Sequence, residues 1–242
     1  MHEALLEKRA SEIQGMFARI AHRYDLLNRV LSLGRDVAWR RAIARRVAKI
    51  DPRRALDMCT GTGDVALALP AAVPTLASDF CVPMLMRAAD KARRRGRHLA
   101  LFAADAARLP LADGSVEAVT VAFGVRNFER LEAGLAELIR VLGVGGKLVI
   151  LEFSHPRGPL APILGWWSRA VPPLVGRWLS GDGEAYDYLP ASVATFPDRD
   201  GLCRVLEDLG LTAVAGTPLT GGVVTLYEGT KKAAVGGVEG GA

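Results

Sequence analysis

The chain contains few of the residues that mark specialised classes of small protein. Three cysteines occur among its 242 residues; they are scattered and odd in number, which excludes a disulfide scaffold. They form no C-x-x-C pair and no cluster with histidine, so we expect no metal site. With 50% hydrophobic and 24% charged residues, the composition is that of a folded globular protein and excludes disorder of the whole chain.

Long apolar runs are also missing. No run approaches the roughly 20 residues that a membrane-spanning helix needs. The N-terminal sequence MHEALLEKRASEI carries Glu and Lys where a signal peptide would have an apolar stretch, so we predict a cytoplasmic protein. The length fits one domain, or one domain with an insertion.

Lysine is scarce, although cations exceed anions. Lys and Arg number 31 against 26 for Asp and Glu, which gives a net charge of +5, and only six of the cations are lysine. Mild basicity is compatible with an anionic ligand, a membrane surface or nucleic acid. Compositional drift in an Ala- and Arg-rich chain is the simpler explanation, so the charge decides nothing alone.

The hydrophobic pattern predicts an α/β fold. Residues 4–50 repeat apolar positions every three to four residues, with a break at Gly34, and we expect helices there as an N-terminal cap spanning 1–50. Further on, short apolar runs alternate with helical stretches, which predicts a parallel sheet covered by helices on both faces. The expected strands are 54–58, 75–79, 98–105, 116–123 and 147–153, followed by a late pair near 211–216 and 222–229. The expected helices between them are 64–70, 83–95, 129–142 and 198–209. The late pair suggests an antiparallel edge that turns near Gly221 and Gly222.

Two segments depart from this alternation. Residues 156–190 hold six prolines and three of the four tryptophans, too apolar for a solvent loop and too proline-rich for one helix. We predict a lid or insertion there, within a single domain spanning 1–232. The glycine-rich tail, residues 233–242, is expected to be disordered.

The strongest motif is RALDMCTGTGDVALAL, residues 54–69. A predicted strand ends at Asp57, a turn follows with Gly61 and Gly63, and a helix begins. Glycine lets a backbone approach a ligand closely, and a helix N-terminus offers free N–H donors. Asp79 ends the next strand, where a carboxylate can accept both hydroxyls of a ribose. The sequence therefore predicts a nucleoside-type cofactor at these strand ends.

Acidic residues decide which cofactor is favoured. Residues 61–66 nearly fit G-x-G-x-x-G/A, so a nicotinamide cofactor is one alternative. Asp64 at the helix N-terminus would repel its pyrophosphate, and Asp57 adds negative charge. Such carboxylates favour a cationic ligand, and S-adenosylmethionine (SAM) carries an ammonium and a sulfonium.

Two later segments complete the pattern. In AADAARLP, Asp105 ends the third strand, where its side chain and the next N–H would meet an adenine; ELIRVLGVGGKLVILEF (137–153) reads as a helix, a Gly turn and a strand. The whole order of motifs resembles the class I SAM-dependent methyltransferases. That resemblance implies a Rossmann-like sheet of seven strands, mostly parallel, with an antiparallel last strand.

Longer segments narrow the resemblance over roughly residues 12–231. They are MFARIAHRYDLLNRVLSLG (16–34), AFGVRNF (122–128), LEFSHP (151–156) and YDYLPASVATFPDRDGL (186–202). These are similar to the ubiquinone/menaquinone biosynthesis C-methyltransferase family, of the demethylmenaquinone methyltransferase type. The resemblance implies C-methylation of a polyprenylated quinol ring by SAM, which leaves S-adenosylhomocysteine and needs no metal.

The resemblance also supplies candidate cofactor contacts. Thr62, Asp79 and the pair Asp105–Ala106 match the family's SAM contacts, and Tyr24 would close the pocket. With the residues of the Gly-rich turn, the predicted cofactor set is Tyr24, Asp57, Gly61, Thr62, Gly63, Asp79, Asp105 and Ala106. The chain departs from the pattern at Cys59, which is Gly in many class I enzymes, and at Ala122, which is Ser in some relatives.

Arg126 and Asn127 are the predicted catalytic residues. The nucleophile must be the reduced quinol, best as its phenolate, and the enzyme must favour that charge. Arg is too basic to accept a proton, so we predict electrostatic stabilisation or positioning of a water for Arg126. For Glu152, a structural hydrogen bond and a role in orienting ligands both stay open.

The acceptor and the partners are less constrained by the sequence. Demethylmenaquinol is favoured over 2-polyprenyl-6-methoxybenzoquinol, because the chain lacks any feature that demands the smaller methoxylated ring, and a homodimer is left open. Trp and Arg within 160–180 suit either a membrane interface at the inner face or a folded lid. A nucleic-acid partner is disfavoured, because residues 123–126 read FGVR where amino-methylating enzymes carry Asn/Asp-Pro-Pro-aromatic. A SAM-binding protein without catalysis is the alternative outside the enzymes.

Overall fold

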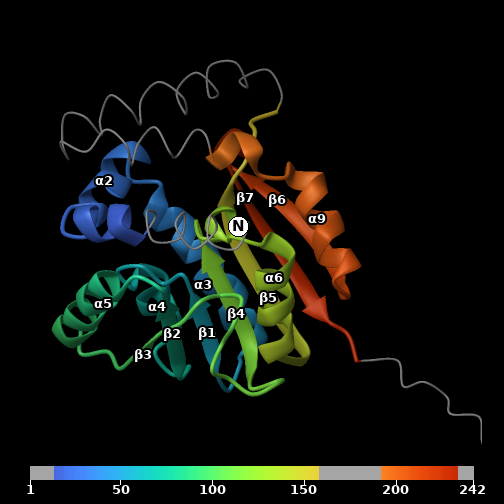
Figure 1. Cartoon of the computed structure of the whole chain (residues 1–242), viewed down its shortest axis with the longest axis horizontal. Helices are drawn as coiled ribbons and strands as arrows, with labels where there is room; N and C mark the ends of the chain where they lie inside the picture. The colour runs from blue at the N-terminus through green and yellow to red at the C-terminus, as the bar shows by residue number, and fades with distance from the viewer. Residues whose placement is uncertain (1–13, 158–191, 234–242) are drawn as a thin grey trace, which may run out of the picture.

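A computed structural model describes residues 14–157 and 192–233 (Figure 1). Most of the predicted insertion at 156–190 lies outside the described residues, as does the predicted tail beyond residue 233. The first 13 residues of the predicted N-terminal cap lie outside them as well.

The described residues form an alternating α/β chain. The strands are β1 (Ala55–Met58), β2 (Thr75–Asp79), β3 (Ala100–Ala103), β4 (Val116–Ala122), β5 (Leu142–Phe153), β6 (Leu211–Leu219) and β7 (Val224–Lys231). The α-helices are α2 (Tyr24–Leu31), α3 (Asp36–Ile50), α4 (Asp64–Ala68), α5 (Val82–Arg94), α6 (Leu131–Val141) and α9 (Arg199–Asp208). Two short 3-10 helices are η1 (Val125–Asn127) and η2 (Thr220–Gly222).

All seven strands pair into one sheet in the order β3-β2-β1-β4-β5-β7-β6. Strand β7 runs antiparallel to both of its neighbours, and the other pairs are parallel, as predicted. The chain builds outward from β1 to β3 and then returns to β4 on the other side of β1. This reversal between β1 and β4 opens a crevice at the carboxyl ends of the strands, where ligands bind in such sheets.

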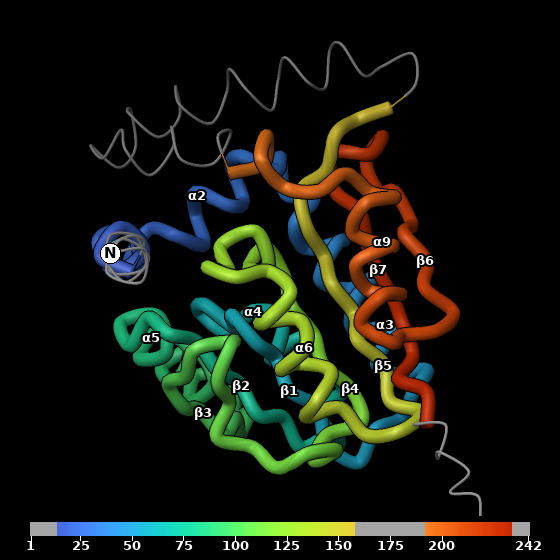
Figure 2. The backbone as a smooth tube through the Cα atoms, turned by 45° about the vertical axis from the view of Figure 1, so that its right-hand side comes forward, coloured from blue at the N-terminus to red at the C-terminus, as the bar shows by residue number. Residues whose placement is uncertain are grey.

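Side chains of the central strands alternate between two cores. In β5, Leu148 and Ile150 pack under α6 and α9, while Val149 and Leu151 pack against α3 and α4. Successive side chains of a strand point to opposite faces, so both faces of this apolar strand are buried. Figure 2 shows α6 and α9 covering the face of the sheet opposite α3.

Three strands differ most from their predicted bounds. Strand β3 is limited to four residues, β5 begins at Leu142, five residues before the expected start, and β6 continues to Leu219. The register with β4 jumps from Val116–Leu142 to Ala118–Lys147, so residues 143–146 form a bulge within β5. A Cβ at Gly146 would lie 2.8 Å from the Glu117 carbonyl oxygen, so glycine permits a close approach that a larger residue would block. The predicted late turn is confirmed, because η2 joins the antiparallel strands β6 and β7.

The N-terminal helices approach the carboxyl ends of the strands. Residues 14–20 are helical, and breaks at 21–23 and 32–35 separate them from α2 and α3. The second break contains the predicted Gly34; the first has no glycine or proline to announce it. Helix α3 is anchored by its buried Trp39, whose Nε1 donates to Thr220 Oγ1 at 2.9 Å.

Candidate active site

A cavity of about 170 Å³ opens at the carboxyl ends of the central strands. Its described lining residues are Phe17, Tyr24, Met58, Cys59, Gly61, Asp79, Phe80, Met84, Asp105, Ala106, Ala122, Phe123, Gly124, Asn127, Phe128 and Glu129. Six predicted residues are therefore brought together there: Tyr24, Gly61, Asp79, Asp105, Ala106 and Asn127. Four predicted residues, Asp57, Thr62, Gly63 and Arg126, lie outside the lining.

The Gly-rich turn is fastened to Asp79, which ends β2. Asp79 Oδ2 accepts from the Gly61 N–H at 2.8 Å, and Oδ1 accepts from the Cys81 N–H at 2.9 Å. Burial raises the pKa of Asp79, while these backbone N–H groups partly counteract the rise. Gly61 has φ 54°, and a Cβ there would face the Tyr24 ring at 3.8 Å. The Gly61 backbone therefore lies between the Asp79 carboxylate and the Tyr24 ring, and it carries no side chain there.

Asp57 stabilises the Gly-rich turn through hydrogen bonds. It is buried and accepts from Thr60 Oγ1 and Thr120 Oγ1, both at 2.6 Å, and from the Ala66 N–H at 3.1 Å. Burial raises its pKa to about 6, although these hydrogen bonds oppose the shift. Its contacts in the structure are internal, so a direct contact with a cofactor stays a prediction.

The charge of the cavity comes from carboxylates. Asp79, Asp105 and Glu129 line it, and none of its described lining residues is Lys or Arg. A cationic ligand is therefore favoured and a pyrophosphate disfavoured. Asp64, which carried this argument in the sequence, does not line the cavity, because its carboxylate is already paired with Lys91 and Arg40.

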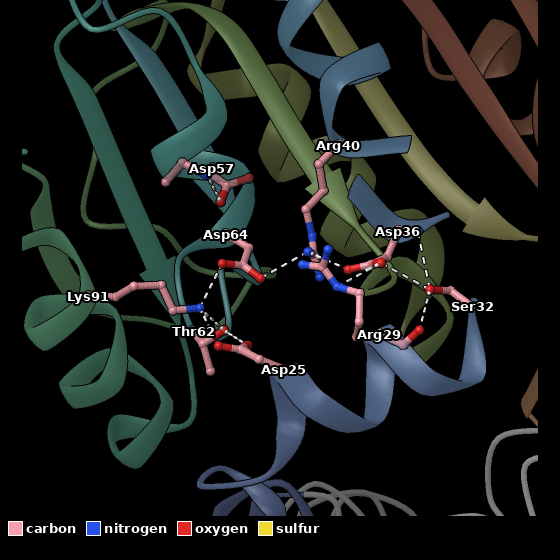
Figure 3. A network of polar contacts seen from close by, with 10 residues as sticks. Asp25, Arg29, Ser32, Asp36, Arg40, Asp57, Thr62, Asp64 and Lys91 are labelled. Atoms are coloured by element: carbon pink, nitrogen blue, oxygen red, sulfur yellow. Dashed lines mark hydrogen bonds and ion pairs between the residues drawn. The ribbon is translucent and has the colours of Figure 1, made fainter. Parts of the chain in front are cut away.

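Lys91 of α5 joins the N-terminal helices to the Gly-rich turn (Figure 3). Its Nζ lies 2.5 Å from Asp25 Oδ2, 2.7 Å from Asp64 Oδ1 and 3.0 Å from Thr62 Oγ1. Thr62 Oγ1 in turn donates to Asp25 Oδ1 at 2.5 Å. Burial alone would raise the pKa of Asp25, but the hydrogen bonds from Lys91 and Thr62 outweigh it and lower the pKa.

The network continues along α3. Arg40 Nη1 lies 3.0 Å from Asp64 Oδ2 and 2.7 Å from Asp36 Oδ2, and Arg29 Nε lies 3.3 Å from Asp36 Oδ1. Sequence reasoning missed this chain of ion pairs, because its members come from α2, α3, α4 and α5. The Asp36–Arg40 pair has the i,i+4 spacing that a helical sequence reveals, but the other pairs of the network join separate elements. The network holds α2, and with it Tyr24, over the cavity.

Arg126 is held by a buried carboxylate. Its Nη1 donates to Glu152 Oε1 at 2.6 Å and to the Phe123 carbonyl oxygen at 2.7 Å, and its guanidinium lies 5.3 Å from the Phe153 ring centroid. Glu152 is fully buried and also accepts from the Arg126 backbone N–H at 3.3 Å. Glu152 thus orients Arg126 beside the cavity, and neighbouring Asn127 is the member of the pair that lines it.

Left-handed backbone flanks the cavity at two strand ends. Cys59 has φ 55° and Phe123 has φ 57°, values uncommon for residues with a Cβ. This explains why glycine suits position 59 in many class I enzymes. The Cys59 side chain fits because its neighbour is Gly124, where a Cβ would lie 2.5 Å from the Cys59 Cβ. Burial and the nearby carboxylates raise the pKa of Cys59 well above its usual range.

The described residues contain neither a metal-binding cluster nor a membrane-spanning helix. Within 14–157 and 192–233, no group of three His, Cys, Asp or Glu side chains could hold a metal ion. No helix in that part of the chain is long and apolar enough to cross a membrane.

Solved structures share this fold. A SAM-dependent methyltransferase from Thermotoga maritima has a TM-score of 0.62 and 19% identity, covering 90% of this chain and 99% of that one. Another from Aquifex aeolicus has a TM-score of 0.51 and 18% identity, covering 73% and 80%. At such identities the likeness shows the fold alone, and that fold is the Rossmann-like one that was predicted.

Sequence relatives are much closer. A demethylmenaquinone methyltransferase from Thermus thermophilus is 43% identical over 220 residues, which span 89% of this chain and 100% of the relative. A ubiquinone/menaquinone biosynthesis C-methyltransferase from Syntrophotalea carbinolica is 44% identical, spanning 89% and 92%. The model of the ubiE/COQ5 methyltransferase family matches residues 4–231.

Proposed function

The chain belongs to the ubiE/COQ5 methyltransferase family, and from that membership we propose that it methylates a ring carbon of a polyprenylated quinol, using SAM. The acceptor we propose is demethylmenaquinol, which would become menaquinol. The observation that supports this acceptor is that relatives 43% identical over nearly their whole length are named demethylmenaquinone methyltransferases. The Syntrophotalea relative, whose name covers both quinones, supports 2-polyprenyl-6-methoxybenzoquinol as the second candidate.

The cavity's donors and acceptors fit SAM. Asp79, at the end of β2, would accept the ribose hydroxyls, since each of its oxygens has a lone pair beyond the one used by backbone N–H. Asp105 and Ala106 would meet the adenine, and Gly61 would let the ligand approach the turn. Thr62 and Gly63 would act less directly, by shaping the turn. The acidic lining favours the sulfonium and ammonium of SAM.

The chain's residues must also prepare the acceptor for attack. SAM supplies an electrophilic methyl group, and the ring carbon becomes nucleophilic when the quinol is a phenolate. Asn127 lines the cavity and can donate a hydrogen bond to the developing phenolate oxygen. Arg126, which directly precedes Asn127, would contribute positive charge from outside the lining, where Glu152 holds its guanidinium at 2.6 Å.

The substrate's prenyl chain sets where the protein must work. Because such a quinol resides in a bilayer, we propose that the protein acts as a peripheral protein at the cytoplasmic face of the membrane. The segment 160–180, which was predicted to contact membrane or to form a lid, lies outside the described residues.

Methyl-labelled SAM tests the proposal. Purified protein is incubated with a reduced short-chain demethylmenaquinol and, separately, with a reduced 2-polyprenyl-6-methoxybenzoquinol, and label in each ring is measured. Label in the naphthoquinol is expected. Label only in the benzoquinol would move the protein to the second acceptor, and label in neither, with SAM binding shown by calorimetry, would refute quinol methylation.

A further inference from the structure

The outward face of α2 exposes large apolar side chains. Leu26 is 57% exposed, Val30 39% and Leu33, just beyond the helix, 70%. Leu26 and Val30 are four residues apart and lie on one side of the helix, and Leu33 follows in the turn after it. The opposite side carries Leu27, which is buried, and Tyr24, which lines the cavity. The helix therefore has two apolar faces, one packed on the protein and one facing outward.

Arginines flank the outward face. Arg29, near the end of α2, and Arg35, just after the helix, are both exposed, and Arg29 also lies 3.3 Å from Asp36. Between residues 14 and 40 the only carboxylates are Asp25 and Asp36. Asp25 turns toward Lys91 and Thr62, and Asp36 is buried beneath Arg29 and Arg40. The outward surface thus combines apolar side chains with positive charge.

Leu33 occupies a backbone position that favours glycine. The Gly34 N–H donates to the Arg29 carbonyl at 2.8 Å and the Leu33 N–H to the Val30 carbonyl at 3.1 Å, the hydrogen bonds of a Schellman motif. Leu33 takes the left-handed position of that motif, with φ 52°, which glycine usually fills. The fold therefore tolerates a leucine that is both conformationally unfavourable and exposed.

We propose that this face, formed by Leu26, Val30 and Leu33 with Arg29 and Arg35, is the surface that docks the protein on an anionic lipid bilayer. Apolar side chains inserted among acyl chains, with arginines at the headgroups, are how amphipathic helices bind membranes. The cytoplasmic leaflet supplies the matching negative charge. Docking would place α2, whose Tyr24 roofs the cavity, against the membrane that holds the prenylated quinol. The reason for docking, which is access to a prenylated quinol, rests on the proposed function. The existence of the exposed surface does not depend on it.

Leu33→Gly separates docking from folding. The substitution removes the exposed side chain and gives the left-handed position its usual residue, so stability should be unchanged or slightly raised. Val144→Ser is the matched control, because Val144 is 68% exposed and lies at the start of β5, at the opposite ends of the strands. Binding is measured by sedimentation with vesicles of equal parts phosphatidylcholine and phosphatidylglycerol, and with vesicles of phosphatidylcholine alone.

Wild type should sediment with the anionic vesicles and release at high salt, since screening weakens the arginine contribution. The double variant Leu26→Ser/Leu33→Gly should bind at least about tenfold more weakly, because the inserted apolar area is lost. Val144→Ser should bind as wild type does. All three proteins should methylate a short-chain, water-dispersed quinol at the same rate.

Two results would overturn the proposal. One is unchanged vesicle binding by the double variant; the other is no binding by wild type, with a wild-type dimer that the double variant dissociates, which would assign the face to a second copy of the chain. Failure of the proposed function has a different signature, because the protein would then bind anionic vesicles and methylate neither quinol.

Discussion

Replacement of Lys91 by methionine tests whether the ion-pair network holds the cavity closed. Methionine keeps most of the apolar stem and removes the ammonium, so the contacts to Asp25, Asp64 and Thr62 are lost together. Asp64 keeps its partner Arg40 at 3.0 Å. The uncompensated group is therefore Asp25, which still accepts from Thr62.

The free energy that the Lys91→Met substitution should cost lies between two limits. Removing one partner of a buried ion pair costs about 3–5 kcal/mol, and an exposed pair is worth about 0–1 kcal/mol. The Lys91 side chain is 12% exposed, but that of Asp25 is 45% exposed. We therefore expect about 1–2 kcal/mol, which is a factor of about 5–30 in an equilibrium constant. Because the network positions α2 over the cavity, this cost should appear as weaker binding of SAM.

Calorimetry gives the dissociation constant of SAM, and urea unfolding shows whether the variant is folded. Arg93→Met is the control, since Arg93 lies on the same helix, has a side chain that is 81% exposed, and pairs with Asp90 of that helix. That control should bind SAM as wild type does. A folded Lys91→Met protein whose SAM affinity stays within twofold of wild type would refute the role given to the network.

Three further changes have expected outcomes. Gly124→Ala should destabilise by about 1–3 kcal/mol in urea unfolding, because its Cβ would lie 2.5 Å from the Cys59 Cβ; Cys59→Gly should restore most of the loss, and additive effects would contradict the contact. Glu152→Gln should cost about 3–5 kcal/mol by leaving Arg126 buried without its carboxylate, and a loss below about 1 kcal/mol would refute the pairing. The folded-state pKa of Asp57, about 6, exceeds the usual 3.8, so ionisation of Asp57 disfavours the folded state above that range. As pH falls from about 7 to about 4, wild type should therefore gain up to about 3 kcal/mol of stability relative to Asp57→Asn, and a pH-independent difference would refute the shift.

Much of the fold followed from local patterns. Short apolar runs alternating with helical stretches predicted the parallel sheet, and the late pair predicted the reversed strand β7. The prediction of strand bounds was least accurate at glycine, which can either form a turn or allow two backbones to approach closely. The segment containing Gly146 was expected to turn before the strand, yet it forms a bulge inside β5, where a residue without a Cβ permits close approach to the Glu117 carbonyl oxygen.

The candidate site was only partly visible in the sequence. Residues at strand ends, such as Asp79 and Asp105, could be placed because the carboxyl ends of parallel strands meet at one edge. The partners of Arg126 and Asp64 could not. Glu152 lies 26 residues from Arg126 and Lys91 lies 27 from Asp64, and no periodicity relates residues on separate elements.

The sequence by itself determined the fold class, the position of the cofactor motif and the resemblance to a family, because each depends on residue type, order and spacing along the chain. Tertiary structure decided which charges are free. It paired Asp64 with Lys91, Arg126 with Glu152 and Asp25 with Thr62, and it left Asp79 and Asp105 on the cavity. It also turned Leu33 outward while burying Leu27. Electrostatics and burial depend on distances in space, and only the folded chain sets those.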